Sequence, residues 1–326
     1  MRFSTKAMTG LAVGVAVLAS LTACSTSSTP SGGSTTPAAE EGTFASGDPG
    51  TLVFATVPDK AGTDAAWKPL EDYIAKKTGL EVEFHATTDY DALIAAAVAG
   101  QVDVGAFSGA TYLKSLYKGA DLDFVTAVST SADYDTPGYY SEAIVPAGSS
   151  IKDVKDFAGK KVCFVSNSST SGFFIPMATL QNAGIDVTST GTDASGNPQF
   201  SAFTAIFAGA HDKSVQAVAS GQCDVGFAED AAAEASGSGV DVISKTLVPG
   251  GPIVVSAALP QSIKDELTDI LGNITIDDIT AEGIPVTDDF KSAFAYTEVV
   301  DPKEFYADVQ WVCDNIAAAK CGKAGA

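Results

Sequence analysis

The sequence predicts an α/β protein made of two similar units. Short apolar runs alternate with longer helix-like stretches along most of the chain, a pattern typical of mostly parallel sheets covered by helices. A segment near residue 100 returns later in the chain with a constant offset, which indicates an internal repeat. With 326 residues, 45% of them hydrophobic, the chain is long enough for two domains of about 150 residues each.

The first unit is expected to alternate strands and helices in chain order. A strand at 52–57 is followed by a helix at 67–77, which stops at Gly79 because glycine is favoured just after a helix. The elements that follow are a strand at 80–84, a helix at 89–99, a strand at 102–107, a turn at Ser108 and Gly109, a helix at 110–118 and a strand at 124–128.

The second unit continues this alternation after a strand that leads into it and before a strand that leads back. Its expected elements are a strand at 142–145, a strand at 161–166, a turn at 167–172, a helix at 173–183, a strand at 223–227 and a strand at 253–257. The helix at 173–183 should stop at Gly184.

The repeat places two polar aromatic side chains at equivalent positions. Val98-Ala-Gly-Gln-Val-Asp-Val-Gly105 returns as Ala219-Ser-Gly-Gln-Cys-Asp-Val-Gly226, an offset of 226 − 105 = 121 residues. Each copy is typical of a helix end, a Gly-Gln turn and a buried strand. The same offset relates Tyr90 to His211, each just before an Asp at the start of the repeated helix. A shared scaffold explains the glycines but not this pair, so the helix starts are candidate binding positions.

A run of hydroxyl residues opens the helix predicted at 173–183. Ser169, Thr170 and Ser171 precede Gly172 there. At a helix N-terminus such residues gather backbone N–H and side-chain O–H groups around one point, where the helix dipole also favours negative charge. The pattern fits an oxyanion site, and it also fits an ordinary helix cap. It is not a Walker phosphate loop, because no lysine follows in the required frame.

The charge balance excludes two classes of partner. Nineteen Lys and Arg stand against 40 Asp and Glu, a net charge of −21. Nucleic acids and anionic lipid surfaces are bound through clustered cations, which so acidic a chain does not offer globally. No nucleic-acid partner is expected, and the membrane should be reached only through a lipid.

The N-terminus has the features of an exported lipoprotein. Arg2 and Lys6 precede an apolar run at 11–21 that is short for a membrane span, as in a secretory signal peptide. Leu21-Thr-Ala-Cys24 resembles the bacterial lipobox, which predicts a signal peptide at 1–23 and a lipid on Cys24. An ordinary signal peptide is the alternative. The stretch 24–50, rich in Ser, Thr, Pro, Gly and Ala, is expected to be a flexible tether.

Four cysteines remain once Cys24 carries lipid, an even number that favours disulfides in an exported chain. Cys313 and Cys321 are close in sequence, so a bond between them would join the last helix to the tail. Cys163 and Cys223 lie in two strand-like runs and can pair if those strands are neighbours; free buried thiols are the alternative. With two histidines and no Cys/His spacing of a metal cluster, no metal and no other cofactor are expected.

A series of short motifs covers nearly the whole body after the tether. They are Trp67-Lys-Pro-Leu-Glu-Asp-Tyr73, Asp89-Tyr90, Gly100-Gln-Val-Asp-Val104, Gly138-Tyr-Tyr-Ser-Glu-Ala-Ile-Val145, Ser168-Ser-Thr-Ser-Gly-Phe173, Gly209-Ala-His-Asp212, Gly221-Gln-Cys-Asp-Val225 and Val248-Pro-Gly-Gly-Pro-Ile-Val254. In this order they resemble the substrate-binding proteins of phosphate, phosphite and phosphonate ABC importers. The resemblance implies the two-lobed type II periplasmic-binding-protein fold, with two mixed sheets flanked by helices and a two-strand hinge.

The resemblance also implies how the chain divides between the lobes. Lobe 1 is expected to hold 51–141 and 258–326, lobe 2 to hold 146–249, and the hinge to lie near 142–145 and 250–257. The ligand is expected in the cleft between them, where closure removes it from water and strengthens each hydrogen bond to it.

Roles for individual residues follow from the same resemblance. Ser169, Thr170 and Ser171 match the turn that holds the ligand oxygens, and His211 matches a histidine that reaches them. Tyr90 and Tyr139 match tyrosines that close the cleft, although Tyr139 and its neighbour Tyr140 alternate on one strand and only one of the two can face it. If His211 donates as a cation, affinity should fall as the pH rises past about 6.5, the usual histidine pKa.

One departure from the family bears on the ligand. Members that bind aminoalkylphosphonates carry an acidic residue at the position of Gly251, where it pairs with the ligand ammonium. A buried ammonium without a carboxylate is costly, so phosphite, phosphate or methylphosphonate is preferred here. Glu229 and Asp230 lie near another acidic position of those members; Asp230 is the candidate ligand residue, as an acceptor for a P–OH group.

The partners implied are a small phosphorus oxyanion and the permease subunits of an ABC importer, with the protein a monomer on the outer face of the cytoplasmic membrane. A binding protein that reports the oxyanion to a membrane kinase is the alternative. A phosphonate-ester hydrolase is a third hypothesis, but no activated nucleophile or metal cluster supports it, and no enzyme activity is expected.

Overall fold

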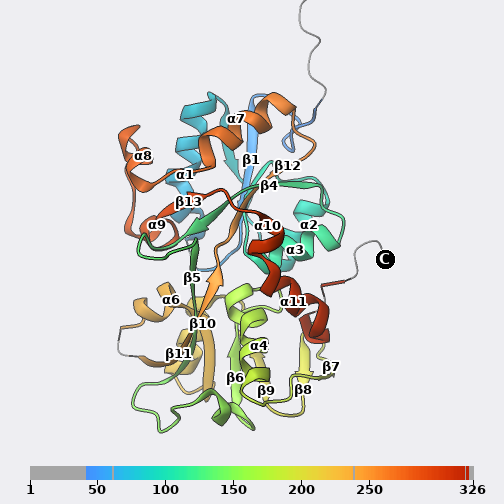
Figure 1. The fold of residues 1–326 in the computed structure, drawn as a ribbon, viewed down its shortest axis with the longest axis vertical. Coiled ribbons are helices and arrows are strands. Elements are labelled where there is room, and N and C mark those ends of the chain that lie inside the picture. Colours follow the sequence, from blue (N-terminus) through green and yellow to red (C-terminus); the bar gives the residue numbers. More distant parts are fainter. Residues whose placement is uncertain (1–41, 61, 238, 320, 323–326) are drawn as a thin grey trace, which may run out of the picture. The chain divides into compact units, whose positions relative to one another are not determined.

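The computed structural model describes residues 42–322 apart from 61, 238 and 320. The predicted signal peptide, Cys24 and most of the predicted tether lie outside the described residues. Within the described part, no helix has the length and apolar character needed to cross a bilayer. Two mixed sheets flanked by helices make up the fold, as Figure 1 shows, so the predicted fold class is confirmed.

The larger sheet has six strands in the order β13-β4-β12-β3-β1-β2. The strands are β1 (Thr51–Thr56), β2 (Glu81–Phe84), β3 (Val104–Ala106), β4 (Leu122–Ser129), β12 (Pro252–Ser256) and β13 (Tyr296–Glu298). The helices of this part are α1 (Thr63–Thr78), α2 (Tyr90–Val98), α3 (Gly109–Tyr117), α7 (Gln261–Leu271), α8 (Ile276–Ala281) and α9 (Asp288–Ala293). We call this sheet and its helices lobe 1.

The smaller main sheet has five strands in the order β11-β5-β10-β6-β9. The strands are β5 (Gly138–Pro146), β6 (Lys161–Phe164), β9 (Thr204–Phe207), β10 (Val225–Glu229) and β11 (Val240–Pro249). Its other elements are the turns η1 (Val154–Phe157) and η2 (Thr170–Phe174), the helices α4 (Ile175–Asn182), α5 (His211–Ala219) and α6 (Asp230–Ala235), and the hairpin of β7 (Ser189–Thr192) and β8 (Pro198–Phe200). We call this part lobe 2.

The C-terminal segment follows lobe 1 in the chain and packs on both lobes. It comprises α10 (Pro302–Phe305), α11 (Ala307–Asn315) and η3 (Ala317–Ala319). Helix α11 contacts α3 of lobe 1 and both α4 and η2 of lobe 2. It therefore joins the lobes beside the two strand crossings.

The internal repeat is visible in the sheet topology. In lobe 1, β1 pairs in parallel with β2 and β3, and in lobe 2, β6 pairs in parallel with β9 and β10. Strand β12 lies antiparallel beside β3, as β5 lies beside β10. Helices α2 and α5 have 9 residues each and start at Tyr90 and His211, with the 121-residue offset of the sequence. Each is followed by a glycine with positive φ, Gly100 at 68° and Gly221 at 77°.

The chain passes between the two sheets at 130–137, from β4 to β5, and at 250–251, from β11 to β12. Residues 142–145, which the sequence analysis placed in the hinge, lie inside β5 and pair with β10 and β11 on its two sides. Residues 252–256 pair with β3 and β4 inside lobe 1. The two crossings also bond to each other, since the Gly250 N–H donates to the Pro137 carbonyl oxygen at 3.1 Å.

Both predicted disulfides are confirmed. Cys163 on β6 bonds Cys223, just before β10, with the Cα atoms 5.8 Å apart. These strands are neighbours in the five-stranded sheet, which was the condition for pairing. Cys313 on α11 bonds Cys321, with a Cα separation of 5.3 Å.

Candidate functional site

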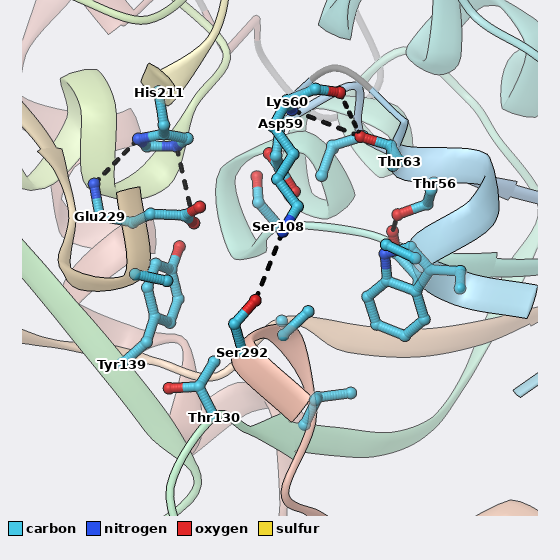
Figure 2. Close-up of a pocket in the computed structure, with 18 of the residues that line it drawn as sticks. Thr56, Asp59, Lys60, Thr63, Ser108, Thr130, Tyr139, His211, Glu229 and Ser292 are labelled. Atoms are coloured by element: carbon cyan, nitrogen blue, oxygen red, sulfur yellow. Dashed lines mark hydrogen bonds and ion pairs between the residues drawn. The ribbon is translucent and has the colours of Figure 1, made fainter. Parts of the chain in front are cut away.

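A cavity of about 90 Å³ lies between the two lobes. A cavity needs roughly 15 Å³ to admit one water, so this one has room for a few water-sized groups. Its wall comes from the loops after β1 and β3, the starts of α2 and α5, strand β5, the turn before η2 and the end of β10. Figure 2 shows labelled side chains of both lobes pointing into this space.

The hydroxyl turn forms part of the wall on the lobe 2 side. Ser169 is the N-cap of the π-helical turn η2, and its Oγ accepts the Gly172 N–H at 3.1 Å. A Cβ at Gly172 would come within 2.4 Å of Val165, so only glycine fits this close approach. All three hydroxyl residues are buried, and of the three only Ser169 lines the cavity.

Thr170 and Ser171 contact residues next to the cavity rather than the cavity itself. The Oγ1 atom of Thr170 accepts the N–H of Ala110, the second residue of α3 in lobe 1, at 2.8 Å. The Oγ atom of Ser171 lies 3.5 Å from Nε2 of His211. The hydroxyl run therefore serves three tasks: Ser169 caps the turn, Thr170 contacts the other lobe, and Ser171 contacts the histidine.

His211 is a neutral donor, because its other ring nitrogen is already an acceptor. The Glu229 backbone N–H donates to Nδ1 at 2.9 Å, so the ring proton is on Nε2. Burial lowers the pKa of His211, and the nearby Asp59, Asp212 and Asp230 only partly oppose this effect. The hypothesis of a cationic His211 is therefore wrong: Nδ1 cannot carry a proton and accept that N–H at once.

Tyr90 and Asp59 form the facing wall on lobe 1. The Tyr90 hydroxyl donates to Oδ1 of Asp59 at 2.6 Å. Tyr90 starts α2, whose N-cap Asp89 accepts the Ala92 N–H, so the ring is fixed by a capped helix end. Burial raises the pKa of Asp59 to about 7, with Glu229 across the cleft as the next largest cause.

Tyr139 rather than Tyr140 faces the cavity. Figure 2 shows the Tyr139 phenol beside the Glu229 carboxyl group. The Tyr140 ring instead contacts Lys245, whose Nζ lies 5.7 Å from the ring centroid, and Tyr134 at 5.4 Å. Alternation of side chains along β5 separates the two tyrosines.

Asp230 lines the cavity, but its carboxylate oxygens have protein partners. Its Oδ2 accepts the Tyr140 N–H at 3.1 Å and the Tyr134 hydroxyl at 3.2 Å, and its Oδ1 accepts the Ala231 N–H. The Glu229 side chain makes no such bonds, and its Oε2 lies 4.0 Å from Nε2 of His211. Of the two acidic residues, Glu229 has the carboxyl group available to a ligand.

Comparison with known proteins decides the family. Residues 53–303 match the family model described as ABC transporter, phosphonate, periplasmic substrate-binding protein. The phosphate-import protein PhnD of Mycolicibacterium smegmatis is 32% identical over 326 aligned positions, which cover 94% of this chain and 95% of that protein.

The chain belongs to the phosphonate family of ABC-transporter substrate-binding proteins.

Solved structures agree on the fold. PhnD1 from Prochlorococcus marinus, in complex with methylphosphonate, has a TM-score of 0.67 at 19% identity and covers 83% of this chain and 100% of its own. A binding-protein component of an ABC phosphonate transporter from Pseudomonas aeruginosa has a TM-score of 0.64 at 17% identity, with coverage of 84% and 97%. The matched family and the relative from Mycolicibacterium smegmatis are substrate-binding components of transporters, so this chain is a binding protein and not an enzyme.

Polar contacts across the cleft hold the two lobes of this binding protein together. Lys114 of α3 is 2% exposed, and its Nζ donates to the Asn167 carbonyl at 2.6 Å and to Ser168 Oγ at 3.0 Å. The Ser168 hydroxyl donates to Oδ1 of Asp91 on α2 at 2.8 Å. We call these four residues the interlobe latch. None of the four lines the cavity.

The sequence analysis missed two residues of the lobe 1 wall, Asp59 and Lys60. Both lie in the loop after β1, and Lys60 Nζ donates to Asp289 at 3.0 Å and to Ser292 at 3.4 Å. Their segment, Val57-Pro-Asp-Lys-Ala-Gly62, looks like an ordinary surface loop. The signal that could have found them is position, since this loop is the strand-to-helix turn of lobe 1 that corresponds to the hydroxyl turn of lobe 2.

Proposed function

We propose that this binding protein captures a small phosphorus oxyanion, namely phosphate, phosphite or methylphosphonate, and delivers it to the permease of an ABC importer. One observation carries the proposal: the hydroxyl turn and the neutral Nε2–H of His211 lie on one wall of a small cavity between the lobes. Hydrogen-bond donors held by buried structure suit an anion that has lost its water.

The proposed ligand residues are those that the resemblance implies. We separate the residues that would contact the ligand from those that would hold the contacting residues in place. Ser169, His211 and Tyr139 would contact the oxyanion, and Tyr90 would close the space from lobe 1. Thr170, Ser171 and Asp230 would position them, since they bond to neighbouring protein groups.

The size of the cavity and the relatives support a small ligand. A cavity of about 90 Å³, with room for a few water-sized groups, suits a small anion. The relative from Mycolicibacterium smegmatis is a phosphate-import protein, and the structure from Prochlorococcus marinus holds methylphosphonate. At Gly251 a Cβ would lie 2.3 Å from the Phe107 carbonyl oxygen, so no acidic side chain fits where aminoalkylphosphonate binders carry one.

A thermal-shift panel tests the proposal. The soluble domain would be heated with phosphate, phosphite, methylphosphonate, 2-aminoethylphosphonate, sulfate and an alkyl sulfonate. A ligand at 1,000 times its dissociation constant should stabilise the domain by about 4 kcal/mol. We expect a shift with the small phosphorus oxyanions, and failure of all of them would overturn the proposal.

Two variants complete this test. Ser169→Ala removes the hydroxyl that is proposed to contact the oxyanion and should weaken binding by roughly tenfold, the effect of one hydrogen bond of about 1.4 kcal/mol. Ser195→Ala, on the exposed turn between β7 and β8, is the matched control and should bind as the unchanged protein does. Equal losses in both variants would mean that the hydroxyl turn is not the binding site.

We also propose that the mature protein begins at Cys24, carries lipid there and works as a monomer on the outer face of the cytoplasmic membrane. The lipobox-like motif and the acidic surface support attachment through lipid rather than through a basic patch. Mass spectrometry of the N-terminal peptide tests this, with Cys24→Ser as the variant that should release the protein. A light-scattering mass of two chains would contradict the monomer.

A further inference from the structure

Two carboxyl groups, one from each lobe, face the cavity without a role in the proposed capture of an anion. Asp59 follows β1 in lobe 1, and Glu229 ends β10 in lobe 2. Figure 2 shows both beside the same space. The lobes meet next to them, since the His211 backbone N–H donates to the Asp59 carbonyl oxygen at 3.1 Å. The two carboxyl groups therefore face the same ligand space from different lobes.

The surroundings do not neutralise this pair. The groups that face Asp59 are Tyr90 from α2, His211 from α5, Glu229 from β10 and Lys60 from its own loop. The charged groups that act on the Glu229 carboxyl are Asp230 from α6, Asp212 from α5 and Lys60. His211 lies 4.0 Å from it, and the Tyr139 phenol of β5 lies beside it. Lys60 is the cation common to both carboxyl groups, and its Nζ is bonded to Asp289 and Ser292. Burial raises the pKa of both carboxyl groups to about 7.

Two ionised carboxylates would repel an incoming oxyanion and would present lone pairs to its oxygens. A P–OH group removes this conflict, because its proton is donated to a carboxylate oxygen. A proton held by the carboxyl pair also removes this conflict, because the carboxylic O–H then donates to a P–O oxygen of the ligand. Sulfate carries no proton near neutral pH and brings acceptors alone.

We propose that Asp59 and Glu229 select oxyanions that carry an acidic proton, so that the cleft binds monoprotonated phosphate or a hydrogen phosphonate and rejects sulfate and fully ionised anions. This inference rests on the proposed function, because it assigns the ligand class of the same cavity. The proton stays within hydrogen bonds between ligand and carboxyl groups, and no covalent bond is formed or broken.

Calorimetric titration of the soluble domain between pH 5.5 and 8.5 tests the inference, with phosphate, methylphosphonate and sulfate as ligands. Each required proton lowers the apparent affinity by about tenfold per pH unit once the pH exceeds the pKa of the group that supplies it. We expect phosphate affinity to fall in this way toward pH 8.5 because the Asp59–Glu229 pair loses its proton, although phosphate itself still carries one. We expect sulfate to bind at least 100-fold more weakly than phosphate at pH 6.

The double variant Asp59→Asn with Glu229→Gln keeps the shape of the pair and replaces its charges with amides, which can donate N–H to an anion. It should bind sulfate at least tenfold more tightly than the unchanged protein and should lose part of the pH dependence for phosphate. Asp269→Asn, which removes an exposed carboxylate of α7 outside the cavity, is the matched control and should behave as the unchanged protein. Melting of each variant without ligand shows that it is folded.

Three results would overturn the inference while leaving the proposed function intact. They are equal affinity for sulfate and phosphate in the unchanged protein, a pH dependence that the double variant keeps in full, and tighter binding of 2-aminoethylphosphonate than of methylphosphonate that the double variant abolishes. The last result would show that the carboxyl pair binds an ammonium group. If no phosphorus oxyanion binds at any pH, the proposed function itself fails.

Discussion

The first strand-to-helix turns of the two lobes occupy the same place in the repeat and carry opposite chemistry. Ala55 on β1 pairs with Gly105, as Cys163 on β6 pairs with Gly226, so the two strands correspond. The turn after β1 presents the carboxyl group of Asp59, and the turn after β6 presents the hydroxyl run. One backbone plan therefore gives an acceptor wall in lobe 1 and a donor wall in lobe 2.

The first residues of α2 and α5 also carry different chemistry in the two lobes. Tyr90 donates to Asp59 within lobe 1, and Nε2 of His211 is directed at Ser171 and Glu229 within lobe 2. Helix α2 is capped by the Asp89 side chain, whereas α5 has no side-chain cap and its first N–H is accepted by the Asp59 carbonyl of the other lobe. The repeat supplies matching positions, and side-chain chemistry decides what each lobe offers.

The disulfide of lobe 2 allows the largest test of this comparison. Cys163 and Cys223 correspond to Ala55 and Val102 in lobe 1, so that lobe lacks the crosslink at this place. Replacing both cysteines by alanine should lower the free energy of unfolding by about 4 kcal/mol, because a loop closed across 60 residues restricts the unfolded chain.

Denaturant unfolding followed by lobe-specific hydrogen exchange would measure this effect, with loss of protection in lobe 2 before lobe 1. The matched control is Cys313→Ala with Cys321→Ala, which opens a loop of 8 residues and should cost about 2.5 kcal/mol. A larger cost for the shorter loop would show that lobe 2 does not depend on its crosslink.

The carboxyl groups of the cleft predict a pH dependence of stability without ligand. The pKa of Asp59 rises from 3.8 to about 7, and that of Glu229 from 4.5 to about 7. The folded protein thus holds protons that the unfolded chain releases, so their stabilising effect is complete below about pH 4 and is lost as the pH rises to about 7. The loss should amount to a few kcal/mol, at about 1.4 kcal/mol per pKa unit.

Urea unfolding of the ligand-free domain at several pH values measures this loss. The Asp59→Asn, Glu229→Gln variant should lose less stability between pH 4 and pH 7 than the unchanged protein. A parallel course in the two proteins would show that these carboxyl groups are solvated in the free protein. Asp269→Asn, on the exposed face of α7, is the control.

The interlobe latch should affect affinity without touching the ligand. Lys114→Met removes the donor to Asn167 and Ser168 and should weaken ligand binding by about tenfold to 100-fold, as expected when a buried charged hydrogen bond of 1.5–3 kcal/mol is lost from the closed form. Lys118→Met changes an exposed lysine just past the end of the same helix and should have no effect. Calorimetry of both variants decides between a latch and a buried lysine of purely structural importance.

The smallest expected effect concerns His211. Its ring should keep the Nε2–H tautomer from pH 8 down to pH 5.5, so its ¹⁵N chemical shifts should stay constant over this range. In urea-unfolded protein the same ring should titrate near pH 6.5, which serves as the control. A titration near 6.5 in the folded protein would restore the hypothesis of a cationic donor.

The sequence predicted the order of strands and helices from β1 to β4, the repeat and both disulfides because these features depend on local pattern or on strand adjacency. It did not predict β7, β8, β9, α6, β11 or the elements after β12. The 121-residue offset reappears in α2 and α5, and the predicted helix at 110–118 differs from α3 by one residue at each end. The predicted helix at 173–183 instead begins with the π-helical turn η2, three residues earlier. Gly172 explains the difference, since its close contact with Val165 draws the turn against β6.

Part of the candidate site could not be predicted because it depends on contacts between distant segments. The hydroxyl run was visible, but a sequence does not show that Thr170 would contact Ala110 in the other lobe. Asp230 was preferred over Glu229 although the fold directs Asp230 to Tyr140 and Tyr134. Asp59 was missed because its raised pKa and its place in the site come from burial and from the facing carboxyl group of Glu229, which only the folded chain brings together.

The two lobes also differ in how the chain builds them. The sheet of lobe 2 is one uninterrupted stretch from β5 to β11, whereas β12 lies between β3 and β4 in the middle of the lobe 1 sheet. Lobe 1 therefore lacks a central strand until residues 252–256 are available. In a chain that emerges N-terminus first, we expect lobe 2 and its disulfide to be finished while the N-terminal half of lobe 1 still waits for its partner strand, which makes that half the segment most in need of a chaperone.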